Sequence, residues 1–485
     1  MSDHALAGLE PALLWKYFAE LSRIPRESKK ERAAGDWVVK VAGELGLEHA
    51  RDKAGNVVVR KPASPGREHL PMVCLQSHLD MVCVKVEGKK HDFARDPIAL
   101  QVVDGWVTAD GTTLGADNGI AVATNLAIAA DRSLEHGPLE FLFTVDEETG
   151  LTGAAELDPE LLRSRILINL DSEEEGFLTV GCAGGTDSSG TWALATDPAK
   201  AGSVAIDVRV TGLKGGHSGV EIHTQRGNAN KLLARIIAEL VPLDARIVKL
   251  EGGAKRNSIP AVATARLALP KARLEDARGI VGCMREVMKA ELDAIEPGLE
   301  VTLDVVKGKP GKVWKRSLQK NILRVLLGLP HGVLKMSPAI PGLVETSTNV
   351  AVMTQTAKAW VLDTSQRSLV ESERVEAANA TRAVLELGGA TVKPSNGYPG
   401  WKPDLSSRIL AVSVRVHENM FGRKPEVVAI HAGLECGLIG RKYPGMDMVS
   451  LGPNITGAHS PQEKVEIASV AKYWNYLLAI LGEVA

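Results

Sequence analysis

Five short polar segments of this chain carry residue types that bind metal ions and activate water. His78 and Asp80 follow an apolar stretch, and Asp117 stands in a glycine-flanked turn. Asp171 follows another apolar stretch, His459 lies near the end of the chain, and the fifth segment is an acidic run described below. Carboxylates and imidazoles are the ligands that Zn²⁺, Mn²⁺ and Co²⁺ accept in proteins. The set therefore points to metal-dependent chemistry.

Each segment also has a plainer interpretation when taken alone. Residues two apart on an extended backbone project to the same side, so Asp80 could orient His78, but an H-x-D pair by itself is weak evidence. Asp117, just before a predicted helix, could simply cap it. The acidic run Asp146–Glu148 could be a solvated loop, although adjacent acids after a buried strand favour a nearby cation. Together the groups exceed the three ligands of a lone catalytic zinc and suit two ions about 3.5–4 Å apart that share a carboxylate.

The N-terminal third of the chain reads as alternating strands and helices. Short apolar runs predict buried strands at 57–59, 72–75, 140–145 and 166–170, and an alanine-rich stretch predicts a helix at 118–130. Ser28, with Glu31 three residues later, predicts a capping box at the start of another helix. This alternation indicates an α/β domain with a mixed, largely parallel sheet covered by helices.

The pattern changes after residue 186. Strand-like alternation at 203–210, 261–269, 299–306 and 358–362 surrounds helical segments at 228–240 and 274–292. This middle part indicates an α+β domain inserted into the first. We therefore expect a catalytic domain formed by residues 1–186 and 400–485, and an inserted lid domain of residues 187–399 whose closure would exclude water.

Composition narrows the class of protein. Hydrophobic residues make up 45%, charged residues 24%, and the formal net charge is -2, so no basic excess indicates nucleic-acid or membrane-surface binding. The five cysteines form no C-x-x-C pair, which argues against a disulfide framework. We find neither an apolar leader nor a long apolar span. These features predict a reduced, cytoplasmic enzyme.

The order of the polar segments carries a specific resemblance. H-x-D is followed by G-A-D-N-G, D-E-E-T-G, N-L-D-S-E and G-A-H-S-P, and in these motifs the chain resembles the M20 family of metallopeptidases. Within the family it is similar to the cytosolic non-specific dipeptidase branch, also called aminoacyl-histidine dipeptidase or peptidase D. Supporting segments are I-P-R-E-S, G-G-H-S-G, P-G-L-V-E-T-S-T-N and H-A-G-L-E-C-G.

The resemblance implies five ligands for two divalent metal ions. Asp117 would bridge the ions. His78 and Asp171 would complete the set of one ion, and Glu148 and His459 that of the other. Zn²⁺ is the favoured metal, with Co²⁺ or Mn²⁺ as alternatives.

The resemblance also implies catalytic roles. Asp80 would orient His78, and Glu147 would take a proton from a metal-bridging water and return it to the leaving amine. His217 would help to stabilise the oxyanion. In related enzymes a histidine of this kind often does so by reaching across a dimer. A glycine-rich turn with an incidental histidine is the alternative for His217, and Asp146 is expected to be structural.

Three further residues are candidates for substrate binding. Asn257 and Arg367 could hold the substrate's carbonyl and its C-terminal carboxylate, which a guanidinium fits with two hydrogen bonds. Glu435 could receive the α-amino group. Plain structural roles are the alternatives for all three.

The resemblance thus implies a homodimer that hydrolyses unblocked dipeptides of broad sequence, with Xaa-His dipeptides among the candidates. An amidohydrolase acting on N-acyl amino acids is one alternative. A metal-bearing protein that binds peptides without cleaving them is another, which the presence of Glu147 disfavours.

Overall fold

The computed structural model describes residues 5–394 and 397–484 and divides the chain into two compact units. Unit 1 consists of Met1–Cys182, Trp401–Ala429 and Leu434–Ala485, and unit 2 consists of Ala183–Gly400 and Ile430–Gly433. Each unit is built around its own cluster of buried hydrophobic side chains. None of the helices in the described ranges is long and apolar enough to cross a membrane.

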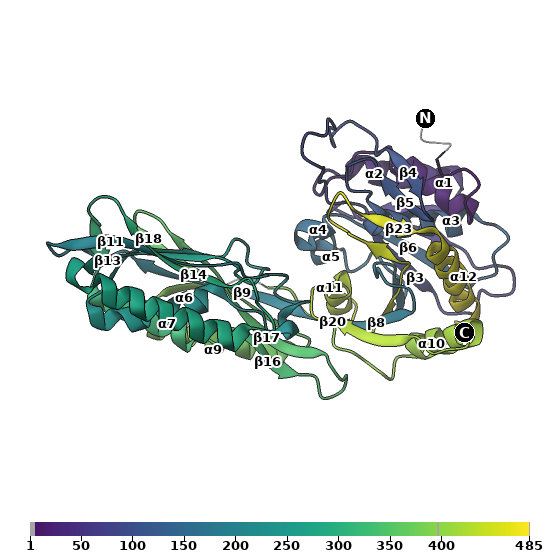
Figure 1. The fold of residues 1–485 in the computed structure, drawn as a ribbon. Helices are drawn as coiled ribbons and strands as arrows, with labels where there is room; N and C mark the ends of the chain where they lie inside the picture. The colour runs from purple at the N-terminus through teal and green to yellow at the C-terminus, as the bar shows by residue number, and fades with distance from the viewer. Residues whose placement is uncertain (1–4, 395–396, 485) are drawn as a thin grey trace. The chain divides into compact units, whose positions relative to one another are not determined.

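Unit 1 is organised by an eight-stranded mixed sheet (Figure 1). Its strand order is β1-β2-β6-β3-β7-β21-β8-β20. The central strands β6, β3, β7 and β21 run parallel, while β1, β2 and β8 pair in antiparallel fashion. The bounds are β1 Glu48–Arg51, β2 Val57–Lys61, β3 Val73–His78, β6 Leu139–Thr144, β7 Ile166–Asn169, β8 Phe177–Cys182, β20 Glu426–Ile430 and β21 Asp447–Ser450. The predicted mixed, largely parallel sheet is confirmed.

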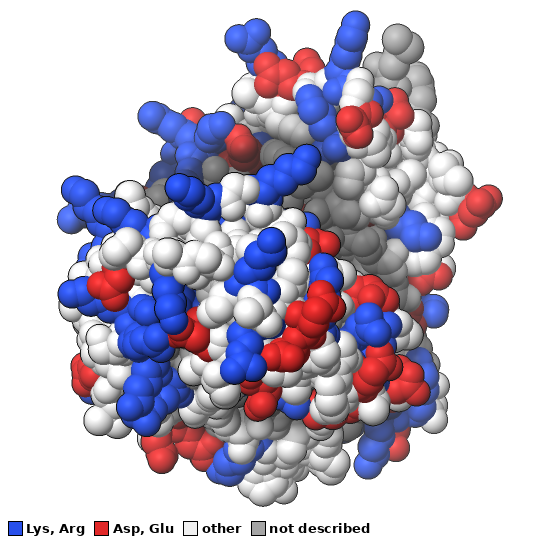
Figure 2. Space-filling view, turned by 60° about the vertical axis from the view of Figure 1, so that its left-hand side comes forward, with Lys and Arg blue, Asp and Glu red and all other residues white. Residues whose placement is uncertain are grey.

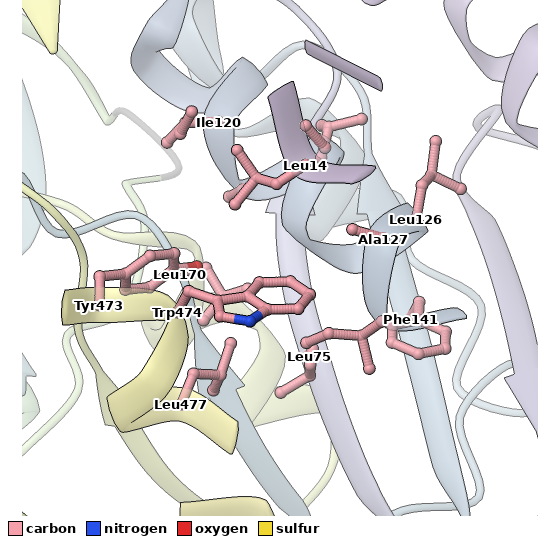
Figure 3. Close-up of a cluster of buried hydrophobic side chains, with 14 of the residues drawn as sticks. Leu14, Leu75, Ile120, Leu126, Ala127, Phe141, Leu170, Tyr473, Trp474 and Leu477 are labelled. Atoms are coloured by element: carbon pink, nitrogen blue, oxygen red, sulfur yellow. The ribbon is translucent and has the colours of Figure 1, made fainter. Parts of the chain in front are cut away.

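Helices cover this sheet because its central strands are apolar on both faces. Every residue of β3 and β6 is buried, as expected for parallel strands between helical layers. In Figure 3, Leu14 of α1 and Leu126 of α3 lie in the same hydrophobic cluster as Leu75, Phe141 and Trp474. The main helices are α1 Ala12–Leu21, α2 Arg32–Glu44, α3 Ala116–Ala130, α10 Arg408–Phe421 and α12 Ile467–Glu483, and the shorter ones are α4 Glu147–Gly150, α5 Thr152–Glu156 and α11 Glu435–Lys442.

A second, four-stranded sheet in unit 1 holds the segment that contains His459. Its order is β22-β23-β5-β4, and all its pairings are antiparallel. The bounds are β4 Leu100–Val103, β5 Trp106–Ala109, β22 Ile455–Thr456 and β23 Lys464–Glu466. His459 therefore lies in the hairpin between β22 and β23.

The predicted capping box at the start of α2 is wrong. The Ser28 hydroxyl donates to Asp80 Oδ2 at 2.8 Å instead. Glu31 Oε1 accepts the backbone N–H groups of Lys29 and Asp146, at 2.6 and 3.0 Å. Each side chain thus has a partner, Asp80 for Ser28 and Asp146 for Glu31, that lies far away in the sequence and that local spacing cannot reveal.

Unit 2 is an antiparallel sheet with helices packed on it. The strand order is β14-β11-β13-β12-β17-β18-β9-β19, with β16 paired to β17. The strands are β9 Gly184–Ala193, β11 Ser203–Thr211, β12 Arg246–Gly252, β13 Ala263–Pro270, β14 Glu300–Val306, β16 Gly332–Met336, β17 Val344–Gln355, β18 Ala359–Ser368 and β19 Thr391–Pro394, with a separate pair β10 Thr196–Pro198 and β15 Lys312–Trp314. The helices are α6 Ala229–Leu240, α7 Leu274–Leu292, α8 Arg316–Gly328 and α9 Glu371–Leu387. The expected α+β architecture of the middle part is therefore present.

The surface of unit 2 carries many basic side chains. Figure 2 shows Lys and Arg spread over much of the face turned to the viewer, with Asp and Glu among them. Arg235 pairs with Glu291 on this unit, at 2.7 Å. Exposed pairs of this kind contribute little to stability, typically about 0–1 kcal/mol each.

Candidate metal centre

The predicted metal-binding side chains of unit 1 follow the carboxyl ends of adjacent parallel strands. β3 ends at His78, β6 ends just before the acidic run, and Asp171 comes two residues after the end of β7. β3 pairs with both β6 and β7, so these three ends meet at one edge of the sheet. Functional residues in α/β sheets gather at such an edge. Asp117, at the start of α3, and His459 complete the group.

Asp117 lies between two sets of side chains. Its Oδ1 is 3.1 Å from His78 Nε2, which is itself 3.4 Å from Asp171 Oδ1. Its Oδ2 is 3.0 Å from His459 Nε2, which is 2.9 Å from Glu148 Oε2. The five side chains thus form two triads that share one carboxylate.

This arrangement fits a pair of divalent cations. The carboxylates of Asp117, Asp171 and Glu148 are only 12%, 9% and 4% exposed. Glu148 Oε1 is buried and has no hydrogen-bond partner among the described residues. Hydrogen bonds that its ring donates to the carboxylates of Asp117 and Glu148 raise the pKa of His459 to about 11. Buried carboxylates that crowd two imidazoles need compensating positive charge, and the donor set of oxygen and imidazole nitrogen suits Zn²⁺, Mn²⁺ or Co²⁺.

Asp80 connects His78 to the acidic loop. Its Oδ1 lies 3.3 Å from His78 Nδ1 and accepts the Glu147 N–H at 3.0 Å, while its Oδ2 accepts the Glu148 N–H at 3.2 Å. Burial acts to raise the pKa of Asp80, but His78 and these N–H groups outweigh burial and lower it to about 2. Asp80 is therefore an anion in contact with both the imidazole and the loop.

Glu147 lies beside the two triads rather than within them. One of its oxygens is within 4.8 Å of ligand atoms of His78 and Glu148. Burial raises the pKa of Glu147 well above its ordinary value; His78 opposes this, and the carboxylates of Asp171 and Glu435 add to it. A carboxylate with raised proton affinity suits a group that takes up a proton and later releases it.

Asp146, by contrast, is committed to the turn. It adopts a left-handed conformation with φ of 51°. Its carboxylate accepts hydrogen bonds from the hydroxyls of Thr149 and Thr152. This is the kind of structural role that we expected for it.

Comparison with known proteins decides the family. The sequence matches the profile described as Peptidase family M20/M25/M40 over residues 74–483. The chain belongs to this family. It is 42% identical over 480 residues, 99% of each chain, to the cytosol non-specific dipeptidase of Escherichia coli K12. Among solved structures it is similar to the aminoacylhistidine dipeptidase of Vibrio alginolyticus, with a TM-score of 0.90, 43% identity and coverage of 99% and 98% of the two chains.

A more distant likeness concerns the fold alone. The aminopeptidase PepT of Bacillus cereus has a TM-score of 0.56 at 19% identity and covers 98% of this chain and 99% of its own. The profile match and the 42% identical relative confirm the predicted M20 resemblance.

Unit 2 of this M20 peptidase brings His217 and Arg367 together. His217 Nδ1 accepts the N–H groups of Gly219 and Val220, at 3.2 and 3.0 Å. Burial, with the Arg367 guanidinium as the second contribution, lowers the pKa of His217 to about 4. At neutral pH the imidazole is uncharged, and because Nδ1 accepts, its proton lies on Nε2. His217 can therefore donate one hydrogen bond from Nε2.

Two residues beside Arg367 were not among our predicted site residues. Arg367 Nη1 donates to the Tyr398 hydroxyl at 2.7 Å. Burial lowers the pKa of His431 to about 3, with Arg367 as the next contribution, and His431 Nε2 is 2.7 Å from Ser347 Oγ. His431 lies in the H-A-G-L-E-C-G motif, whereas Tyr398 stands in a Gly-Tyr-Pro context that carries no chemical signal.

Asn257 and Glu435 occupy contrasting environments. Asn257 is exposed in unit 2, and its backbone carbonyl accepts the Ser218 N–H at 2.9 Å. Glu435 is fully buried in unit 1, where its Oε2 accepts hydrogen bonds from Gln76 and Thr144 at 2.6 and 2.7 Å. Its Oε1 has no partner among the described residues.

Proposed function

We propose that this M20 peptidase hydrolyses unblocked dipeptides with broad side-chain tolerance, Xaa-His dipeptides included. Two divalent cations would be held by His78, Asp117, Glu148, Asp171 and His459. The observation that carries the proposal is the division of the two Asp117 oxygens between two triads. Similarity over nearly the whole chain to two proteins named as dipeptidases supports the substrate class.

The proposed chemistry divides between the cations and the side chains around them. Bound cations would supply a water that ionises near neutral pH and would polarise the scissile carbonyl. Glu147 takes up the water proton on its carboxylate and transfers it to the leaving nitrogen when the C–N bond breaks. Asp80 keeps the Glu147 backbone in place through the N–H bond that it accepts.

The proposed substrate contacts follow from charge and donor type. His217 donates from Nε2 to the carbonyl oxygen as negative charge develops on it. Arg367 binds the terminal carboxylate, and Asn257 contributes an amide donor to the carbonyl. Glu435, whose Oε1 has no described partner, accepts the substrate's ammonium group.

Several broader features remain proposals. We favour Zn²⁺ over Co²⁺ and Mn²⁺, a cytoplasmic location, and a homodimer. A catalytic domain of residues 1–186 and 400–485 with a lid of residues 187–399 is part of the same proposal.

The experiment that tests the function combines metal removal with a base variant. Metal-stripped protein is titrated with Zn²⁺, Mn²⁺ or Co²⁺ and assayed on dipeptides and on N-acyl amino acids, with Glu147→Gln in parallel. We expect dipeptidase activity to return at up to two ions per chain. The variant should bind the ions but lose activity by roughly 10²–10⁴-fold.

Two results would reject parts of this proposal. Turnover of N-acyl amino acids alone would retain the metal site but replace the substrate. Full activity of Glu147→Gln would remove Glu147 as the base.

A further inference from the structure

The loop that carries Asp117 has an unusual backbone. Gly115 is left-handed, with φ of 71°, and the residues that follow it, Asp117 and Asn118, have non-helical torsion angles although they begin α3. Such a start leaves backbone N–H groups that helical hydrogen bonding does not satisfy. The partners of these groups therefore determine where the Asp117 carboxylate points.

Glu463 satisfies the N–H groups of this loop. Its Oε2 accepts those of Leu114 and Gly115 at 2.8 and 2.9 Å, and its Oε1 accepts that of Asp117 at 3.1 Å. Glu463 is only 2% exposed. It follows His459 by four residues in the β22–β23 hairpin, so one short segment supplies both a proposed ligand and the acceptor for the Asp117 backbone.

Arg26 binds the carbonyl side of the same loop, where the Gly115 C=O also accepts the Gly119 N–H at 3.1 Å. This arginine is also 2% exposed, and its Nη2 donates to Gly115 O at 2.5 Å. Its Nη1 donates to Leu79 O and Asp80 O at 3.1 and 3.0 Å. The guanidinium thus joins the Asp117 loop to the segment that follows His78.

Arg26 and Glu463 therefore bracket one glycine: the Gly115 N–H bonds to the anion and its C=O bonds to the cation. We infer that Arg26 and Glu463 are positioning residues that hold Asp117 as the shared ligand of the two cations. They do so by tying its loop to the segments that carry His78 and His459. This inference rests on the metal site of the proposed function and extends it to two residues outside the ligand set.

Charge explains why this arrangement serves a cation better than it serves the fold alone. A buried carboxylate next to Asp117 adds a negative charge to a cluster that already has several, and bound cations would relieve the repulsion that the Arg26 guanidinium leaves. A neutral hydrogen-bond acceptor could satisfy the same N–H groups without that repulsion. Groups behind metal ligands commonly change metal affinity by about 10–100-fold when replaced.

The test is metal binding by Glu463→Gln, which keeps the side-chain shape but replaces one acceptor oxygen by an NH₂ group. Metal-stripped protein is titrated with Zn²⁺ against a chromophoric chelator, and the visible spectrum of the Co²⁺ form is recorded. We expect the dissociation constant of at least one ion to rise about 10–100-fold and the Co²⁺ spectrum to change.

Glu466→Gln is the matched control. Glu466 belongs to the same segment and accepts a hydrogen bond from Asn454 at 2.7 Å, outside the Asp117 loop. Its substitution should leave the affinity and the spectrum unchanged. Arg26→Lys is the second variant: it retains the positive charge but cannot reach three carbonyls as a fork, so the same loss of affinity is expected.

The results separate this inference from the proposed function. If the wild-type chain binds no pair of ions, both fail. If it binds two ions and folded Glu463→Gln binds them with the same affinity and the same Co²⁺ spectrum, the positioning role is rejected while the metal site stands. Should Glu463→Gln fail to fold, unchanged binding by Arg26→Lys rejects the role.

Discussion

Gly119 shows at the scale of one residue how closely the start of α3 is packed. A Cβ at this position would lie 2.7 Å from Arg26 Nη2 and 3.2 Å from a ring carbon of Phe18. The backbone here is not left-handed, so an alanine would be unfavourable because its Cβ clashes with neighbouring side chains and not because of its backbone conformation. The absence of a side chain at Gly119 thus leaves room for the buried guanidinium.

Gly119→Ala should therefore disturb Arg26 without substituting any of the proposed ligands. We expect a loss of stability of about 1–3 kcal/mol, typical of overpacked sites, together with weaker Zn²⁺ binding. Thermal unfolding of the metal-free protein and a chelator titration measure the two effects. Gly43→Ala is the control, because a Cβ there meets no atom within 4 Å. Equal stability and metal affinity in both variants would contradict the prediction.

Arg367 gives a second prediction at this scale, since its proposed role depends on one charge of the substrate. Arg367→Ala should raise KM for a dipeptide by roughly 30-fold. The loss of a charge-assisted hydrogen bond costs about 2 kcal/mol of binding free energy, which corresponds to this factor. A dipeptide amide, which lacks the carboxylate, should show almost no difference between variant and wild type. Steady-state kinetics on both substrates check this, with the exposed Arg382→Ala as control. An unchanged KM for the dipeptide would remove Arg367 from the site.

The residue types in the sequence indicated the metal-binding chemistry of the centre. They did not indicate the hydrogen bonds that hold its loops. His78 and Asp117 stand in segments whose composition already indicated metal binding, and the structure brings them within 3.1 Å. Glu463 gave no such signal, because Gln462–Glu466 reads as a solvated, mostly polar stretch. Its role depends on a loop nearly 350 positions earlier in the sequence. Long-range pairing of this kind cannot be found from local spacing.

At the scale of elements, the strands that the sequence predicted are those whose buried residues are apolar. The apolar runs that became β3 and β6 were found because strands buried on both faces are apolar throughout. The strand β17 was missed, since its first half, Val344–Asn349, is mostly polar yet buried. There, Asn349 donates to the carbonyls of Arg256 and Ser258. Its hydrogen bonds offset the cost of burial, and no hydropathy pattern reveals them.

The N-terminus of α6 provides a prediction about pH. The Asn228 side chain accepts the Lys231 N–H and lies 3.3 Å from His331 Nδ1. Burial, with Lys231 as the second contribution, lowers the pKa of His331 from 6.5 to about 4. Between these two values the unfolded chain binds more protons at His331 than the folded chain does. Unit 2 should therefore lose stability as the pH falls from 6.5 towards 4.

His331→Gln should remove this contribution, which is no more than about 3 kcal/mol. Because carboxylates titrate in the same range, the quantity to measure is the difference in Tm between variant and wild type at several pH values. That difference should shift in favour of the variant on acidification. The exposed His223→Gln is the control and should follow the wild type throughout. A constant difference from pH 7 to pH 4 would show that His331 does not titrate as described.

At the scale of the whole molecule, residues that are far apart in the sequence lie in the same unit. The five proposed metal ligands come from positions 78 to 459, yet all lie in unit 1, because the chain returns to this unit after unit 2. His217 and Arg367 belong to unit 2, which has a separate core that includes Trp192, Trp314 and Trp360. The two sets of proposed functional residues thus depend on two independently packed interiors.

This separation predicts where bound metal should stabilise the protein. A ligand present at 100 times its dissociation constant stabilises the state that binds it by about 2.7 kcal/mol. All five ligands connect segments of unit 1, so hydrogen exchange on adding Zn²⁺ to the metal-free chain should slow most in residues 78–81, 114–120 and 455–466. The strands β11 and β13 of unit 2 should exchange at the same rate with and without metal. Asp117→Asn, which removes the shared charge, should lose the protection in unit 1. Equal slowing in both units would contradict a centre built from unit 1 alone, because the stabilising contacts would then have to include ligands that unit 1 does not contain.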